Sequence, residues 1–197
     1  EGKSQVDPAT GVHAARQLAQ VLEQVALFLE DPAPVLALPD EVDGCVGRIA
    51  IHPGSGGTAK NWRLEDWVKI GQEVATAIPG TRLLLVTGEA EETKHAEVTA
   101  AWSASGLDYE HAHCWALPRL AAALGRSKLF LGHDSGISHL AAAAGTPCLL
   151  LFGPTDPAVW APANPGVEVL RSDSGSMADI TYGEVADGLR RRLEKLP

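Results

Sequence analysis

One stretch of this chain has residue types and spacing that could do chemistry. It is a predicted tight turn before a helix of small residues. The stretch 132–139 reads GHDSGISH and follows a short apolar run. In a strand–loop–helix unit, this is the point where unpaired backbone N–H groups and the helix dipole favour an anion. We therefore expect Ser135, with the N–H groups of Ser135 and Gly136, to form an anion cradle. Asp134 either belongs to this cradle or caps the helix.

A second stretch, 52–62, reads HPGSGGTAKNW and follows another apolar run. Its glycines would let backbone N–H groups approach a phosphate, and Lys60 could reach the same charge. It is not a Walker A loop, because Ala59 precedes Lys60 and Asn61 follows it. The alternative interpretation is a flexible turn with a solvated lysine.

A third stretch, 87–92, reads TGEAEE and places carboxylates just after a predicted strand. A carboxylate at that position can accept hydrogen bonds from the hydroxyls of a ribose, as in dinucleotide-binding folds. Acidic residues also favour the first turn of a helix for purely electrostatic reasons. The sequence alone leaves both interpretations open.

Asp134, Ser135 and His139 also raise the possibility of a hydrolase, which the local pattern disfavours. The chain has no G-x-S-x-G elbow, and a serine beside its acid on one tight turn does not form a triad with His139 by local geometry. A packed, hydrogen-bonded histidine is the alternative interpretation of His139.

The sequence shows no pattern of metal ligands. The chain has no Asp-x-Asp pair for a Mg²⁺–diphosphate, and its three unclustered cysteines argue against a disulfide framework or a zinc site. We therefore predict no metal.

The elements that must position these residues alternate between strand and helix, which predicts an α/β fold. We expect a Rossmann-like, doubly wound, mostly parallel sheet with helices on both faces. Residues 1–46 are predicted to form an amphipathic helix, with Thr10 as its N-cap, and a linker, and residues 47–197 a nucleotide-binding domain. The predicted strands are 49–51, 82–86, 109–113, 128–131, 147–152 and 167–170. The predicted helices are 12–29, 64–78, 90–103, 118–124, 137–144 and 181–196.

The composition of the chain argues against some classes of binding partner. The 197 residues carry a formal net charge of −9, which argues against a nucleic-acid partner or a polybasic membrane patch. No apolar run approaches the roughly 18 residues that a transmembrane helix needs. The cysteine pattern favours reduced thiols in the cytosol. We expect a cytoplasmic chain, with peripheral attachment at the inner face of the inner membrane as the alternative.

Several short motifs occur in a specific order: HPG at 52–54, KNW at 60–62, GHDSGISHL at 132–140, FGPTDP at 152–157 and WAP at 160–162. Together they resemble glycosyltransferase family 9, the lipopolysaccharide heptosyltransferases. The resemblance covers the chain from about residue 11 onward, and only loosely over 11–46. It implies one half of a GT-B glycosyltransferase, the C-terminal Rossmann-like domain that holds the nucleotide-sugar donor.

The resemblance also implies a set of donor-binding residues. Three of them would hold the diphosphate, with Lys60 as the catalytic group that neutralises the leaving group: Ser55, Gly56 and Lys60. Four would hold the phosphates and sugar of the donor: Asp134, Ser135, Gly136 and His139. Glu91 would bind the ribose, in preference to Glu89, and Trp115 would line the base pocket.

The reaction implied is an inverting, metal-independent transfer of heptose from an ADP-heptose donor to a lipopolysaccharide core or other glycan acceptor. It needs no cofactor beyond the nucleotide-sugar substrate. In the family, the catalytic carboxylate and the acceptor surface belong to an N-terminal domain. We therefore expect this chain to be a donor-binding half that is inactive alone. The alternatives are a non-catalytic nucleotide-binding module and a GT-B enzyme that uses another nucleotide sugar.

Overall fold

The fold is built on a six-stranded sheet in which every neighbouring pair of strands is parallel. The computed structural model describes residues 6–38 and 47–196. The spatial order of the strands is β3-β2-β1-β4-β5-β6, and the predicted doubly wound α/β fold is confirmed. The strands are β1 Ile49–Ile51, β2 Leu83–Thr87, β3 Tyr109–His113, β4 Leu129–His133, β5 Cys148–Phe152 and β6 Val167–Arg171.

Each face of the sheet carries its own hydrophobic cluster, because successive side chains of a strand point to opposite faces. The central strands β1, β4 and β5 are apolar on both faces, as expected for strands covered from both sides. One face packs against α2 (Leu64–Ala77), α3 (His95–Ala104) and α7 (Tyr182–Leu193). The other packs against α4 (Leu117–Gly125) and α5 (Gly136–Ala143).

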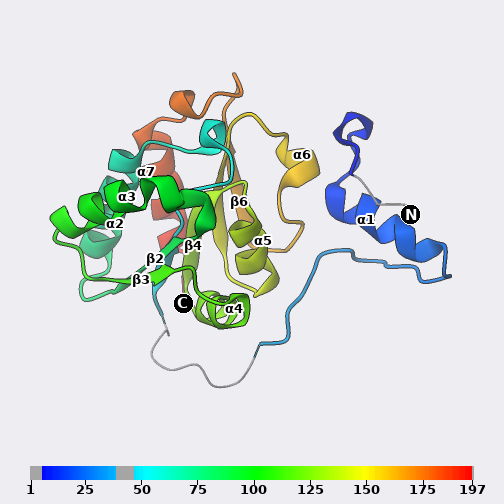
Figure 1. The fold of residues 1–197 in the computed structure, drawn as a ribbon, viewed down its shortest axis with the longest axis horizontal. Helices are drawn as coiled ribbons and strands as arrows, with labels where there is room; N and C mark the ends of the chain where they lie inside the picture. The colour runs from blue at the N-terminus through cyan, green and yellow to red at the C-terminus, as the bar shows by residue number, and fades with distance from the viewer. Residues whose placement is uncertain (1–5, 39–46, 197) are drawn as a thin grey trace.

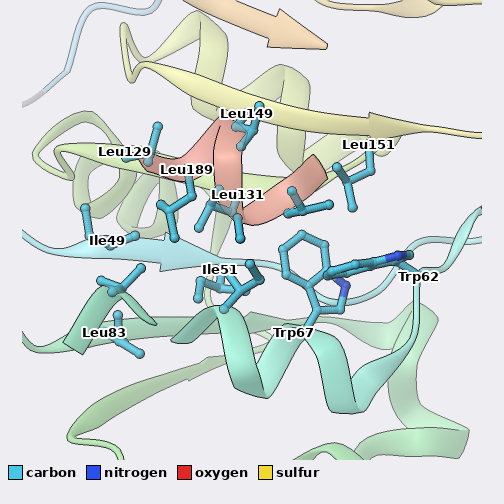
Figure 2. Close-up of a cluster of buried hydrophobic side chains, with 14 of the residues drawn as sticks. Ile49, Ile51, Trp62, Trp67, Leu83, Leu129, Leu131, Leu149, Leu151 and Leu189 are labelled. Atoms are coloured by element: carbon cyan, nitrogen blue, oxygen red, sulfur yellow. The ribbon is translucent and has the colours of Figure 1, made fainter. Parts of the chain in front are cut away.

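Two tryptophans stand at one end of the first cluster. Figure 2 shows Trp62 and Trp67 beside Ile51 and Leu151, which lie toward the carboxyl ends of their strands. Their ring centroids are 5.3 Å apart with an interplanar angle of 85°, the edge-to-face arrangement that aromatic pairs prefer. This pair therefore brings apolar packing up to the edge of the sheet where the loops begin.

The order of the strands reverses direction between β1 and β4. The chain runs outward from β1 through β2 to β3, then returns to β4 on the other side of β1. In such sheets the crevice outside the carboxyl ends of the two strands at this crossover is where ligands bind. The loop that follows β1 is the second stretch described above, 52–62, and the loop at the end of β4 is the first, 132–139.

The N-terminal helix is shorter than predicted. Instead of spanning 12–29, α1 runs from Ala14 to Glu23, and it lies to one side of the sheet (Figure 1). Thr10 is not its N-cap, because Gly11 adopts a left-handed conformation with φ 66° that separates Thr10 from the helix. The cap is His13, whose Nδ1 accepts a hydrogen bond from the backbone N–H of Ala15 at 3.1 Å.

Two further differences from the predicted elements concern short helices. The predicted helix 90–103 is divided into a 3-10 helix, η3 (Glu89–Lys94), and α3. The short α6 (Pro157–Trp160) follows Asp156, whose carboxylate accepts from the N–H of Ala158 at 3.2 Å. None of the helices in the described ranges combines the length and the apolar character that crossing a bilayer requires.

The packing predicts that two leucine-to-alanine substitutions lower the free energy of unfolding by very different amounts. Leu149, on β5, is fully buried, and Leu149→Ala should lower the free energy of unfolding by about 2–5 kcal/mol because it leaves a cavity. Leu117, at the start of α4, is 60% exposed, and Leu117→Ala should change it by less than about 0.5 kcal/mol. Urea denaturation of both variants checks this, and equal losses would contradict the described core.

Candidate functional site

A buried histidine joins the loops that follow β1 and β4. His133, the last residue of β4, has its Nε2 2.9 Å from the backbone nitrogen of Trp62 and 3.3 Å from Nε1 of Trp67. Both groups are N–H donors, so Nε2 accepts and the ring proton belongs on Nδ1. Nδ1 lies 3.3 Å from the carbonyl oxygen of Gly54, to which it can donate. The two loops are thereby held as one unit.

Lys60 and Asp134 meet across the crossover between β1 and β4. The Lys60 Nζ lies 3.2 Å from Oδ2 of Asp134, in a pair whose side chains are 28% and 12% exposed. The sequence left Asp134 as either a helix cap or part of an anion cradle. The structure gives the cap to Ser135, whose Oγ accepts from the N–H of Ser138 at 3.3 Å. Asp134 instead positions the lysine.

The start of α5 faces the same crevice. Gly136 is the first residue of the helix and is exposed, and a Cβ placed on it would meet nothing within 4 Å. The first N–H groups of a helix lack intrahelical acceptors and so remain suited to an anion. The Ser135 hydroxyl lies 3.4 Å from Nδ1 of the buried His52, which ties this helix start back to the end of β1.

Ser55 and Gly56 occupy different positions in the loop after β1. Ser55 is buried, and its Oγ lies 2.7 Å from Oδ1 of Asn61 and 3.0 Å from the carbonyl oxygen of Gly57. Its hydroxyl therefore shapes the loop from within. Gly56 is exposed, with open space where a side chain would be. The predicted contact of these two residues with a diphosphate stays a prediction.

His139 lies one turn into α5 and is partly buried. Burial lowers the pKa of its imidazole below the ordinary value of 6.5, and the nearby Asp134 carboxylate opposes that shift. The ring is therefore mainly neutral at pH 7, so it is a hydrogen-bonding group and not a cation for a phosphate. It borders a cavity of about 710 Å³, lined mostly by apolar residues of α1 and of the chain that follows it, together with Gly136 and Trp160.

The remaining predicted residues follow β2 and β3. Trp115 is partly buried against the α4 and α5 face, and the guanidinium of Arg119 lies 3.6 Å from its ring centroid. Arg119 therefore covers one face of the Trp115 ring. Glu91 belongs to η3, but its side chain lies outside the described part of the chain.

The structure thus brings four predicted residues to the crossover: Lys60, Asp134, Ser135 and Gly136. His139 lies one turn beyond them on α5, and Trp115 follows the edge strand β3. Sequence reasoning missed the role of His133, although this residue stands inside the quoted 132–140 motif. A buried strand that ends in histidine was the available signal, because a buried imidazole needs hydrogen-bond partners.

These features define a class of protein. A parallel sheet in the order 3-2-1-4-5-6, with a lysine and a helix N-terminus at the crossover, is a Rossmann-like architecture. The family model of glycosyltransferase family 9 (heptosyltransferase) matches residues 16–189. The chain belongs to this family.

Known proteins of the same kind agree. Lipopolysaccharide heptosyltransferase 1 of Pseudomonas aeruginosa is 30% identical over 164 residues, which cover 76% of this chain and 42% of the relative. The chain spans about two fifths of the length of the curated relatives it matches. The crystal structure of a family 9 glycosyltransferase from Veillonella parvula has a TM-score of 0.80 at 20% identity, covering 97% of this chain and 62% of that one. Escherichia coli heptosyltransferase WaaC with ADP has a TM-score of 0.71 at 19% identity, covering 97% and 58%.

The position of His133 predicts a loss of stability when its hydrogen bonds are removed. His133→Leu keeps an apolar side chain in the buried space but leaves the groups it bonded on Gly54, Trp62 and Trp67 unpaired. Because one buried unpaired group costs roughly 1–3 kcal/mol, the free energy of unfolding should fall by at least about 2 kcal/mol.

Chemical denaturation followed by tryptophan fluorescence measures this loss. His13→Leu is the matched control, because His13 caps α1 outside the sheet and bonds Ala15 and the carbonyl oxygen of Ala161. A His133→Leu variant as stable as the wild type would show that this histidine does not hold the two loops.

Proposed function

We propose that this chain is the donor-binding half of a heptosyltransferase and that it binds the diphosphate of an ADP-sugar at the crossover between β1 and β4. The observation that carries the proposal is the meeting of Lys60 and the N-terminus of α5 at this point, with Asp134 holding the lysine in place. In a chain of net charge −9, the Lys60 ammonium and the helix N-terminus are two groups at this point that attract an anion.

The sheet order supports an extended course for the nucleotide. All strands are parallel, so the loops after β4, β1, β2 and β3 follow one another along the same edge. Neighbouring strands lie about 4.8 Å apart, which puts the end of β3 roughly 10 Å from the end of β1. A diphosphate at the crossover would place the ribose near the 88–92 turn and the base near Trp115. The sugar would extend the other way, toward His139.

The carboxylate of Asp134 has a defined part in this proposal. A carboxylate accepts hydrogen bonds but repels phosphate oxygens, so Asp134 would not bind the diphosphate directly. It would hold Lys60 in place in the empty site. In the occupied site it would accept a hydrogen bond from a hydroxyl of the donor sugar. The lysine would then meet the negative charge that develops on the leaving ADP, which is electrostatic stabilisation of the transition state.

The fuller reaction is an extension of this proposal. It is an inverting transfer of heptose without a metal, to a lipopolysaccharide core or other glycan acceptor held by an N-terminal domain that also supplies the catalytic base. Two solved neighbours support the choice of donor: the E. coli heptosyltransferase WaaC structures contain ADP and ADP-2-deoxy-2-fluoro heptose. The donor would be met in the cytoplasm.

Calorimetric titration with ADP, UDP, GDP and CMP tests the proposal. We expect selective binding of ADP, and Lys60→Ala should weaken it by roughly 10- to 100-fold, the value of one hydrogen bond to a charged group. Lys60→Arg, which keeps the charge, should lose less.

The matched control is Lys69→Ala, because Lys69 also pairs with an aspartate, Asp66, but does so on α2 away from the crossover. This variant should bind ADP like the wild type. Preference for UDP or GDP would keep the site and reject the ADP-heptose donor. ADP binding that is equal in Lys60→Ala and the wild type would reject the site.

A further inference from the structure

Three histidines gather where α3 begins beside the edge strand β3. His111 and His113 are separated by one residue on β3 and therefore point to the same face of the sheet. His95, the first residue of α3, packs on that face, with its ring centroid 4.0 Å from that of His113 and 5.3 Å from that of His111. One ring nitrogen from each of the three lies within 4.8 Å of the others.

A shared hydroxyl orients two of these rings. Thr87, the last residue of β2, has its Oγ1 2.8 Å from Nε2 of His111 and 3.0 Å from Nδ1 of His113. The hydroxyl oxygen has two lone pairs and can accept from an N–H of each ring. In that tautomer of each ring, the second nitrogen keeps its lone pair for another partner. Thr87 is thus placed like the outer partners that orient metal-binding histidines.

One observation in the described residues indicates that the cluster lacks a partner. Nδ1 of His95 is buried and has no hydrogen-bond partner among these residues, which is unusual for a ring nitrogen.

Cys114, the residue after β3, is a further candidate ligand beside the three histidines. Cys114 has a φ of 48°, in the left-handed region that favours glycine, and its Sγ lies 3.6 Å from Nε2 of His113. Glu92 approaches the same ring atom, with Oε2 at 3.8 Å. An ion bound to His113 would therefore find a thiol and a carboxylate beside it.

We propose that His95, His111 and His113 form a binding site for one Zn²⁺ ion or a similar divalent transition metal, with water, Cys114 or Glu92 as the fourth ligand. Imidazole nitrogens suit Zn²⁺, which prefers four ligands in a tetrahedron. Tetrahedral Zn–N bonds of about 2.0–2.1 Å put ligand nitrogens roughly 3.4 Å apart, so modest ring rotations bring the three into range. The site does not depend on nucleotide binding.

The ion would hold the turn between β2 and α3 in place. It would connect the first residue of α3 to β3, closing residues 88–94, the turn whose carboxylates are the candidates for ribose contact. The sequence carried a signal for this site in the His-x-His of β3, which the sequence analysis passed over because it weighed only cysteines and paired carboxylates.

The test is a titration of the chain, freed of any affinity tag and treated with chelator, with ZnCl₂ by calorimetry and with CoCl₂ by visible absorption. We expect one ion per chain and the absorption bands of tetrahedral Co²⁺. His95→Gln and His113→Gln should each weaken Zn²⁺ binding by more than about 100-fold, beyond the loss typical of an outer partner. Thr87→Val, which keeps all three rings, should weaken it by roughly 10- to 100-fold.

His13→Gln is the matched control, because it removes a histidine that lies outside the cluster, and it should bind Zn²⁺ like the wild type. Circular dichroism of each variant without metal separates loss of ligands from loss of fold. If His113→Gln fails to fold, the wild-type Co²⁺ spectrum and the Thr87→Val titration decide. Absence of binding by the wild type, or Zn²⁺ affinity unchanged in His95→Gln and Thr87→Val, would overturn the proposal.

Discussion

The hydrogen bonds of His133 are the interaction on which the candidate site depends. This one imidazole stands at the end of β4 and bonds the backbone of Trp62, the indole of Trp67 and the carbonyl of Gly54. A parallel sheet by itself fixes where strands end but not how the loops beyond them are folded. His133 makes the loop after β1 follow β4, and the approach of Lys60 to Asp134 depends on that arrangement.

The charges at the crossover form one partly buried ion pair. Lys60 and Asp134 are only partly exposed, so their attraction is screened less than that of a surface pair. In the absence of ligand, the carboxylate compensates the lysine. The proposed diphosphate would offer the lysine and the start of α5 more negative charge than one carboxylate does. The same side chains would then serve both the empty site and the proposed occupied one.

The sequence predicted the four inner strands well because they are short apolar runs between clear turn signals. The predicted strand 109–113 coincides with β3, whereas the predicted helix 12–29 was too long. Apolar spacing continues beyond Glu23, but Ala26 adopts a φ of 60°, which helical periodicity does not reveal. Likewise, Lys60 and Asp134 were named as site residues, but their pairing is a tertiary contact over 74 positions that no local pattern encodes.

The most direct test of the central claim is to find where ADP touches the chain. An amide ¹H–¹⁵N spectrum recorded during titration with ADP reports this for each residue. The account predicts the largest shifts in 54–61 and 134–139, with smaller ones near Trp115. Shifts concentrated instead around the 370 Å³ pocket between Arg171 and Arg191, with the crossover unaffected, would contradict it.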